Sequence, residues 1–186
     1  MHSILENVAT HTVLNEVEKK FFVSMLKNRS LKRKEFLYRA GEHHDALTFV
    51  SKGCLRTYST DPQGNEHIVM FSPENWWCAD MASFLTGKPA AYSIDTLLPA
   101  DVWGITNTNL EKLYKEIPVF ERFFRMLFQN AFIIYQNRIT GNLSLKAEQR
   151  YKQFIKTYPG LQSRIPQKYI ASYLGVTPEF FSGMKK

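Results

Sequence analysis

Few residues in this chain have the types and spacing that catalysis or metal binding requires. Cys54 and Cys78 are too few for a four-thiolate zinc site, an all-cysteine iron–sulfur cluster or a disulfide framework, so we expect two free thiols. His43 and His44 are adjacent, and adjacent strand residues point to opposite faces, so together with His67 they do not predict a metal site. No Walker A, GxGxxG or Ser/His/Asp pattern is present. The sequence therefore predicts no enzyme, no metal and no resident cofactor.

The most informative pattern lies near the C-terminus, where IPQKYIASYLGVTPEFFSGMKK fits a helix-turn-helix. Ala171 is the small residue needed where two helices cross, and Gly175 permits the positive φ of the turn. Thr177 is a good N-cap and Pro178 a favourable first residue, so we expect the second helix to begin at Pro178. The expected inward-facing residues are Ile170, Leu174, Val176 and Phe181.

Such a unit binds DNA by laying its second helix in the major groove, with the first outward residues against base edges. Residues around the first helix would meet phosphate. The predicted DNA-contacting residues are Arg164, Gln167, Lys168, Thr177, Pro178, Glu179, Ser182 and Lys185. A helical hairpin that only closes a core would show the same alanine and glycine, so other evidence must separate the two interpretations.

The distribution of charge separates them. The 186 residues include 24 Lys and Arg and 17 Asp and Glu, a net charge of +7. Residues 1–145 hold 16 basic and 15 acidic side chains, a net of +1, whereas residues 146–186 hold 8 basic and 2 acidic side chains, a net of +6. A basic segment around a helix-turn-helix favours double-stranded DNA as the partner.

The remaining elements must position this motif. Apolar residues spaced three or four apart predict a helix over 15–27, and short runs between turn signals predict six to eight strands over 30–105. The loops are expected at 61–65 and 72–75. Such strands suggest an antiparallel sandwich or barrel. Asn107 and Thr108 are the expected caps of a short helix that ends at Lys115. Another short helix is expected from 147 to Pro159, which makes the fold class α+β.

A long helix is expected to start at Pro118 and to run to about residue 140. Its apolar residues at steps of 4, 3, 4 and 3 are Phe120, Phe124, Leu127, Ala131 and Ile134. Further apolar residues flank this stripe, so the helix must bury two sides. Either it is a core helix of one chain, or it packs on its own sheet and, through the stripe, on a second subunit. We favour the second interpretation, a homodimer.

The chain has no sign of membrane insertion or export. No segment offers the roughly 18 uninterrupted apolar residues of a membrane span. The N-terminus lacks a basic region followed by an apolar run. We therefore expect a soluble cytoplasmic protein with no membrane partner.

This order of elements resembles the catabolite activator (Crp/Fnr) superfamily of bacterial transcription factors, over essentially the whole chain. Residues 147–182 are similar to its subgroup common in Bacteroidetes. The resemblance implies an N-terminal helix and a cyclic-nucleotide-binding-type β-barrel, or jelly roll, over 1–117. It also implies a dimerisation helix over 118–140 and a helix-turn-helix of winged-helix type over 141–186, truncated at its end. A palindromic DNA site and RNA polymerase are the partners that it implies.

The ligand cassette departs from that of cyclic-AMP-binding relatives. There, a Gly-Glu-Leu run holds the ribose and a downstream Arg-Ser pair holds the cyclic phosphate. Here Cys78-Ala79-Asp80 replaces the run and residues 89–93 contain no Arg, so we expect no cyclic-nucleotide binding. The pocket candidates are Trp76, Trp77, Cys78, Ala79, Asp80, Met81, Ala91, Tyr92, Ser93, Tyr135 and Gln136. Either these side chains fill the pocket themselves or an unidentified small ligand does.

A second departure lies in the reading helix. Relatives usually carry Arg where this chain has Gly183, and a glycine costs about 1 kcal/mol inside a helix. Two functions therefore remain open. The favoured one is a dimeric, sequence-specific transcription regulator. The alternative is a ligand-binding or interaction module that keeps the fold with a decayed DNA reader.

Overall fold

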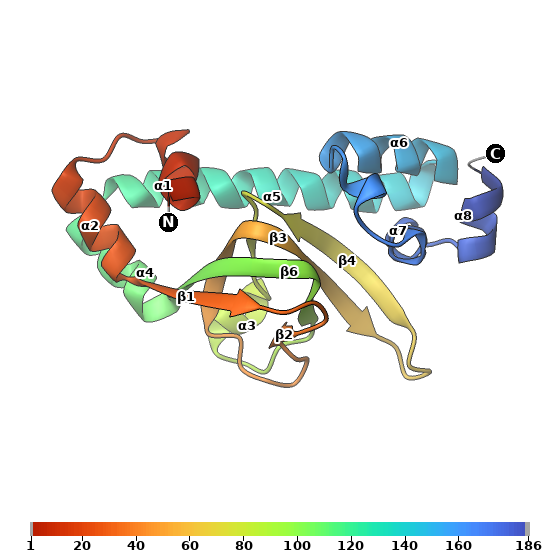
Figure 1. The fold of residues 1–186 in the computed structure, drawn as a ribbon, viewed down its shortest axis with the longest axis horizontal. Helices are drawn as coiled ribbons and strands as arrows, with labels where there is room; N and C mark the ends of the chain where they lie inside the picture. Colours follow the sequence, from red (N-terminus) through yellow and green to blue (C-terminus); the bar gives the residue numbers. More distant parts are fainter. Residues whose placement is uncertain (1, 185–186) are drawn as a thin grey trace.

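The computed structural model describes residues 2–184, with one long helix running along most of the molecule (Figure 1). In chain order the elements are α1 (His2–Ala9), α2 (Glu16–Ser24), β1 (Leu26–Leu31), β2 (Phe36–Tyr38), β3 (Ala46–Thr60), β4 (Glu66–Pro73), β5 (Trp77–Cys78), α3 (Met81–Thr86), β6 (Ser93–Thr106), α4 (Asn107–Glu116), α5 (Val119–Ser144), α6 (Ala147–Thr157), a 3₁₀ turn (Leu161–Ser163), α7 (Gln167–Leu174) and α8 (Pro178–Met184). Figure 1 shows the sheet against the middle of α5, with α1 and α2 towards one end and α6, α7 and α8 towards the other.

The N-terminal helical region differs from the prediction. The expected helix over 15–27 is α2, which begins after Asn15 in a capping box: Asn15 Oδ1 accepts from Glu18 N, and Glu18 Oε2 accepts from Asn15 N. It ends at Ser24 because Leu26 already pairs with Ile105 in the sheet. A further helix, α1, precedes it and was not predicted. It buries Ile4 and Val8.

The sheet is antiparallel and six-stranded, but it is not a closed barrel. Its strands run in the order β1-β6-β3-β4, with β2 paired to β6 and β5 paired to β3. The hairpin loop at 61–65 lies between β3 and β4 as predicted. The predicted closure was wrong because α7, not a strand, lies beside β4: Ser172 Oγ donates to Glu66 O and accepts from Ile68 N. A helix thus occupies polar groups of the β4 main chain where a closing strand would pair.

The core has a separate aromatic cluster towards each end of α5. Around its N-terminal turns, Phe120, Phe123 and Phe124 are buried with Phe22 and Trp77. At the other end, residues of the sheet and of α6, α7 and α8 share one cluster, which includes Phe71, Phe154, Tyr158, Tyr173 and Phe181. The C-terminal helices therefore pack directly on the sheet.

The long helix extends past its expected end. It was predicted to stop at residue 140 but continues to Ser144, so the predicted domain boundary at 141 falls inside it. Its start agrees with the prediction, since Pro118 is the N-cap. Within residues 2–184, no helix combines the length and the apolar character that crossing a bilayer needs.

Both cysteines are buried free thiols, as expected. Burial raises the pKa of Cys54 and of Cys78 to about 12. Both thiols are therefore protonated and unreactive at neutral pH.

Candidate functional site

An apolar cavity of about 230 Å³ lies between the sheet and α5. The predicted pocket residues that line it are Trp76, Trp77, Cys78, Ala79, Met81 and Tyr135. Tyr135 donates from its hydroxyl to Met70 Sδ at 3.6 Å, and burial raises the pKa of Tyr135 to about 12. At neutral pH this hydroxyl is therefore a neutral donor in a mostly apolar wall.

Sequence reasoning missed most of the α5 side of this cavity. The additional lining residues are Leu47, Met70, Asn75, Leu127, Phe128, Asn130, Ala131 and Ile134. Leu127, Ala131 and Ile134, which are predicted for a dimer interface, line this cavity together with Leu47 and Met70 of the sheet. This part of the apolar stripe on α5 therefore forms a wall of the cavity, and its contact with a second subunit stays a prediction.

Two further residues of the predicted dimer stripe lie in the core. Phe120 and Phe124 are both 0% exposed, and Phe120 packs on Phe22 with ring centroids 4.7 Å apart. Their assignment to a dimer interface was wrong, because α2, α4 and the sheet already cover this face of α5. The exposed apolar residues lie elsewhere on the helix: Phe132, Ile133, Ile139 and Leu143.

The other predicted pocket residues do not line the apolar cavity. They are Asp80, Ala91, Tyr92, Ser93 and Gln136. Asp80 is 2% exposed and acts as the N-cap of α3, with Oδ1 accepting from Ser83 N at 3.1 Å. Its Oδ2 accepts from Ala91 N at 2.8 Å and from Tyr92 N at 3.1 Å. A fixed internal carboxylate thus occupies three main-chain donors that converge on one point.

His44 supports this arrangement from the loop that precedes β3. Its Nδ1 accepts from Asp80 N at 2.8 Å, and its ring packs on Tyr38 at a centroid distance of 3.6 Å. The Nε2 atom is buried and has no hydrogen-bond partner in the described part of the chain. Burial lowers the pKa of His44 from 6.5 to about 4. His44 is therefore a neutral acceptor at physiological pH.

This shift predicts a loss of stability in mild acid. The unfolded chain takes up a proton at His44 near pH 6.5, but the folded chain does so only near pH 4. The free energy of unfolding should therefore fall as the pH drops from 6.5 to 4, by about 3 kcal/mol in all. Urea unfolding across this pH range should show the fall in the free energy of unfolding. The variant His44→Asn keeps a hydrogen-bond acceptor but does not titrate, so it should lose the part of this pH dependence that His44 contributes. An unchanged slope in the variant would contradict the assignment.

Residues 28–116 match the family model described as cyclic nucleotide-binding domain. The β-rich segment has the cyclic nucleotide-binding fold. No curated protein matches the chain in sequence. Similar solved structures extend the likeness beyond this segment.

Three of these structures resemble this chain over most of its length. FixK2 from Bradyrhizobium japonicum is 17% identical at a TM-score of 0.72, covering 85% of this chain and 81% of FixK2. A transcriptional regulator of the Crp/Fnr family from Eubacterium rectale is 20% identical at 0.70, covering 92% and 82%. The c-di-GMP responsive global regulator CLP from Xanthomonas campestris is 12% identical at 0.72, covering 91% and 89%. The shared feature is the fold.

The C-terminal helices following the cyclic nucleotide-binding fold expose most of the predicted DNA-contacting residues. Ala171 and Phe181 are buried between the helices, and Gly175 has φ 66°, as the motif required. The exposed predicted residues are Arg164, Gln167, Lys168, Thr177, Pro178, Glu179 and Ser182. Lys185 lies outside the described residues. The outward side of α8 and the start of α7 are thus accessible.

Arg164, although exposed, is held by the cyclic nucleotide-binding fold. Its two Nη atoms donate to Glu74 Oε2 at 2.8 Å and to Glu74 Oε1 at 2.7 Å. Glu74 also accepts from Gly53 N at 2.9 Å, and its bond to Arg164 lowers the pKa of the Glu74 carboxyl. A phosphate contact by Arg164 would require this ion pair to open.

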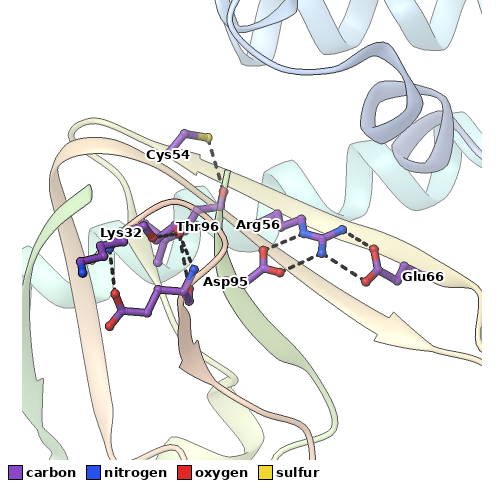
Figure 2. A network of polar contacts seen from close by, with 8 residues as sticks. Lys32, Cys54, Arg56, Glu66, Asp95 and Thr96 are labelled. Carbon is purple, nitrogen blue, oxygen red and sulfur yellow. Dashed lines mark hydrogen bonds and ion pairs between the residues drawn. The ribbon is translucent and has the colours of Figure 1, made fainter. Parts of the chain in front are cut away.

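Arg56 forms a second link between the sheet and the C-terminal helices. Figure 2 shows its guanidinium between the carboxylates of Asp95 and Glu66. Its Nε donates to Asp95 Oδ1 at 2.7 Å and its Nη2 to Asp95 Oδ2 at 2.8 Å. The same guanidinium lies 4.7 Å from the ring centroid of Tyr169 on α7. This buried ion pair therefore contacts α7 as well as the strands.

Proposed function

We propose that the chain is a sequence-specific, DNA-binding transcription regulator of the Crp/Fnr type that acts in the cytoplasm. The observation that carries the proposal is the start of α8. Thr177 Oγ1 accepts from Phe180 N at 3.2 Å, so the helix is capped where the motif requires. Thr177, Pro178, Glu179 and Ser182 are all exposed there, within the segment that carries the net charge of +6. A capped, exposed helix in a basic segment suits the major groove of DNA.

The proposed regulator is a homodimer on a palindromic site. Phe132, Ile139 and Leu143 are spaced by seven and four residues and therefore lie on one side of α5. They are 62%, 60% and 83% exposed, which is unusual for large apolar side chains. A second copy packed along this side would cover them and would bring two α8 helices to one duplex.

The proposed regulator binds a small effector in the apolar cavity, and this effector is not a cyclic nucleotide. The cavity offers tryptophan and methionine side chains but no cation among its lining residues. A cyclic phosphate placed against the amides of Ala91 and Tyr92 would meet the Asp80 carboxylate instead of a guanidinium. The lack of a cation in the cavity lining and the carboxylate of Asp80 both disfavour the binding of a charged sugar phosphate.

Calorimetric titration with cyclic AMP and cyclic GMP should therefore give no binding in the micromolar range. A phosphate brought next to a buried carboxylate loses its water without gaining an opposite charge. Differential scanning fluorimetry with the same nucleotides should show no shift in melting temperature. Micromolar affinity for either nucleotide would contradict this prediction.

DNA binding is tested by selection from fragmented genomic DNA, followed by titration of the selected site over a range of salt concentrations. A palindromic sequence should be enriched, and log affinity against log salt should have a slope of several units, with about 0.9 from each phosphate that the protein neutralises. Lys168→Ala should reduce that slope, by about 0.9 for each phosphate per duplex that the variant no longer neutralises. The matched control is Lys32→Ala, which removes an exposed cation before β2 and should leave the slope unchanged. A flat salt response with no enriched sequence would favour the interaction module with a decayed reader.

A further inference from the structure

A second cavity, of about 450 Å³, lies among α5, α6 and α7. It has a basic character that the apolar cavity lacks. Arg138 on α5 and Arg150 and Lys156 on α6 line it, and no Asp or Glu does. We call it the basic cleft. Three cations around one hollow without a lining carboxylate form a positive site that attracts an anion.

The two arginine charges are held in place but are not neutralised. The Arg138 guanidinium donates to the main-chain carbonyls of Ile68 at 2.6 Å and Tyr173 at 3.2 Å, and also to Val69 O. Arg150 Nη1 donates to Leu145 O at 2.8 Å. In the described part of the chain, the Nε atoms of both arginines are buried without a hydrogen-bond partner. Carbonyl groups orient a guanidinium but carry no net charge, so the cations still repel one another.

The other walls suit an organic molecule. Asn137, Asn142 and Gln153 bring side-chain amides that can donate to oxygen. Gln153 comes close because Gly141 has no side chain: a Cβ at Gly141 would lie 2.8 Å from Gln153 Oε1. Trp76 lines both this cleft and the apolar cavity, and offers an aromatic surface to the body of a ligand.

We propose that the basic cleft binds a small organic anion with at least two negative charges on one group, a phosphate monoester, with its apolar body against Trp76. The fork-shaped arginine side chains and the amides match the several oxygens of a phosphate. This site is independent of DNA binding, because the cleft belongs to a single chain. A DNA backbone is the less suitable occupant, because the cations line a hollow walled by three helices.

The test uses phenyl phosphate as the probe, with the full chain. Calorimetry should show saturable binding, and phenyl phosphate should also change the tryptophan fluorescence, since Trp76 lines the cleft. Phenol, which lacks the charge, should not bind, and inorganic phosphate, which lacks the ring, should bind more weakly. Trp76→Phe should remove the fluorescence change while the calorimetric binding persists.

Charge reversal identifies the site. Lys156→Glu should weaken the binding of phenyl phosphate at least about tenfold, because an attractive charge becomes a repulsive one. Lys152→Glu, on the same helix but outside the lining of the cleft, is the matched control and should change affinity by less than about threefold. Both residues are exposed, so neither variant should disturb folding. Arg150→Gln should weaken binding in the same way, once its melting curve shows a folded protein.

Three results would overturn the proposal. The first is no saturation by phenyl phosphate below about 10 mM, which corresponds to less than about 3 kcal/mol. The second is an equal loss of affinity in the Lys156 and Lys152 variants. The third is a Lys156→Glu variant that binds phenyl phosphate normally but loses DNA, which would assign the cations to DNA phosphates.

Discussion

Replacing Asp95 by alanine is expected to destabilise the fold by about 3 kcal/mol, because it leaves the buried Arg56 guanidinium without its main partner. Arg56 and Asp95 are each 5% exposed and are joined by two hydrogen bonds of 2.7 and 2.8 Å (Figure 2). Burial alone would lower the pKa of Arg56, but the bonds to Asp95 and Glu66 outweigh it and raise the pKa. Urea unfolding at pH 7 measures the loss.

Two variants separate this buried pair from ordinary surface charge. Glu66, on the other side of Arg56, has a 42% exposed side chain, so Glu66→Ala should cost no more than about 1 kcal/mol. The double variant Arg56→Met with Asp95→Leu replaces the pair with apolar groups and should recover most of the loss. If Asp95→Ala cost no more than Glu66→Ala, the buried pair would not have the importance that its geometry indicates.

The loss should also reach the C-terminal helices. Arg56 lies 4.1 Å from the ring centroid of Tyr58 on its own strand and 4.7 Å from that of Tyr169 on α7. Hydrogen exchange in α7 should therefore rise more in Asp95→Ala than in Glu66→Ala. The ion pair thereby connects the stability of the sheet with the placement of the helix that precedes the proposed reader.

Local chemistry made several elements predictable. Helix α4 begins close to its predicted start, although its cap is Thr106, which accepts from Asn109 N at 3.2 Å, and not Asn107 or Thr108 as predicted. Pro178 begins α8 and Gly175 supplies the positive φ before it, both as predicted. These features depend on one or two residues and their nearest neighbours. A sequence pattern contains all the information that they need.

Features that depend on what an apolar surface packs against could not be predicted from local sequence. The periodicity of α5 marked an apolar side but did not say whether that side meets its own sheet or another chain. Phe124 is therefore core, and Ile134 lines a cavity. The open edge of the sheet was unpredictable for the same reason. It depends on the packing of α7 on β4, where Ser172 hydrogen-bonds to residues more than 100 positions away in the chain. No local pattern encodes such a contact.

The candidate pocket was predicted in part for a similar reason. The resemblance gave positions along the sequence, and the run from Trp76 to Ala79 does line the apolar cavity. It could not indicate that Asp80 turns away and satisfies the amides of Ser83, Ala91 and Tyr92. A carboxylate in the sequence does not reveal which donors it will meet. The basic cleft went unnoticed because its cations come from two helices.

Placing an aspartate at Leu143 is expected to raise the dissociation constant of the proposed homodimer at least about 100-fold. In a dimer through Phe132, Ile139 and Leu143, each substitution occurs twice and puts a charge into an apolar interface, where an unpaired charge costs several kcal/mol. The monomer should keep its stability, because Leu143 is 83% exposed in the single chain. Sedimentation velocity at micromolar concentration should show a dimer for the unaltered chain and a monomer for Leu143→Asp.

Two controls distinguish this interface from the alternatives. Val17→Asp introduces the same charge at a 77% exposed apolar residue on α2 and should leave the dimer intact. Phe124→Asp should instead lower the melting temperature sharply, because Phe124 is 0% exposed in the core of one chain. A monomer at micromolar concentration for the unaltered chain would contradict the homodimer. A Leu143→Asp variant that remains dimeric would place the interface on another surface, and the two reading helices would then need a different geometry on DNA.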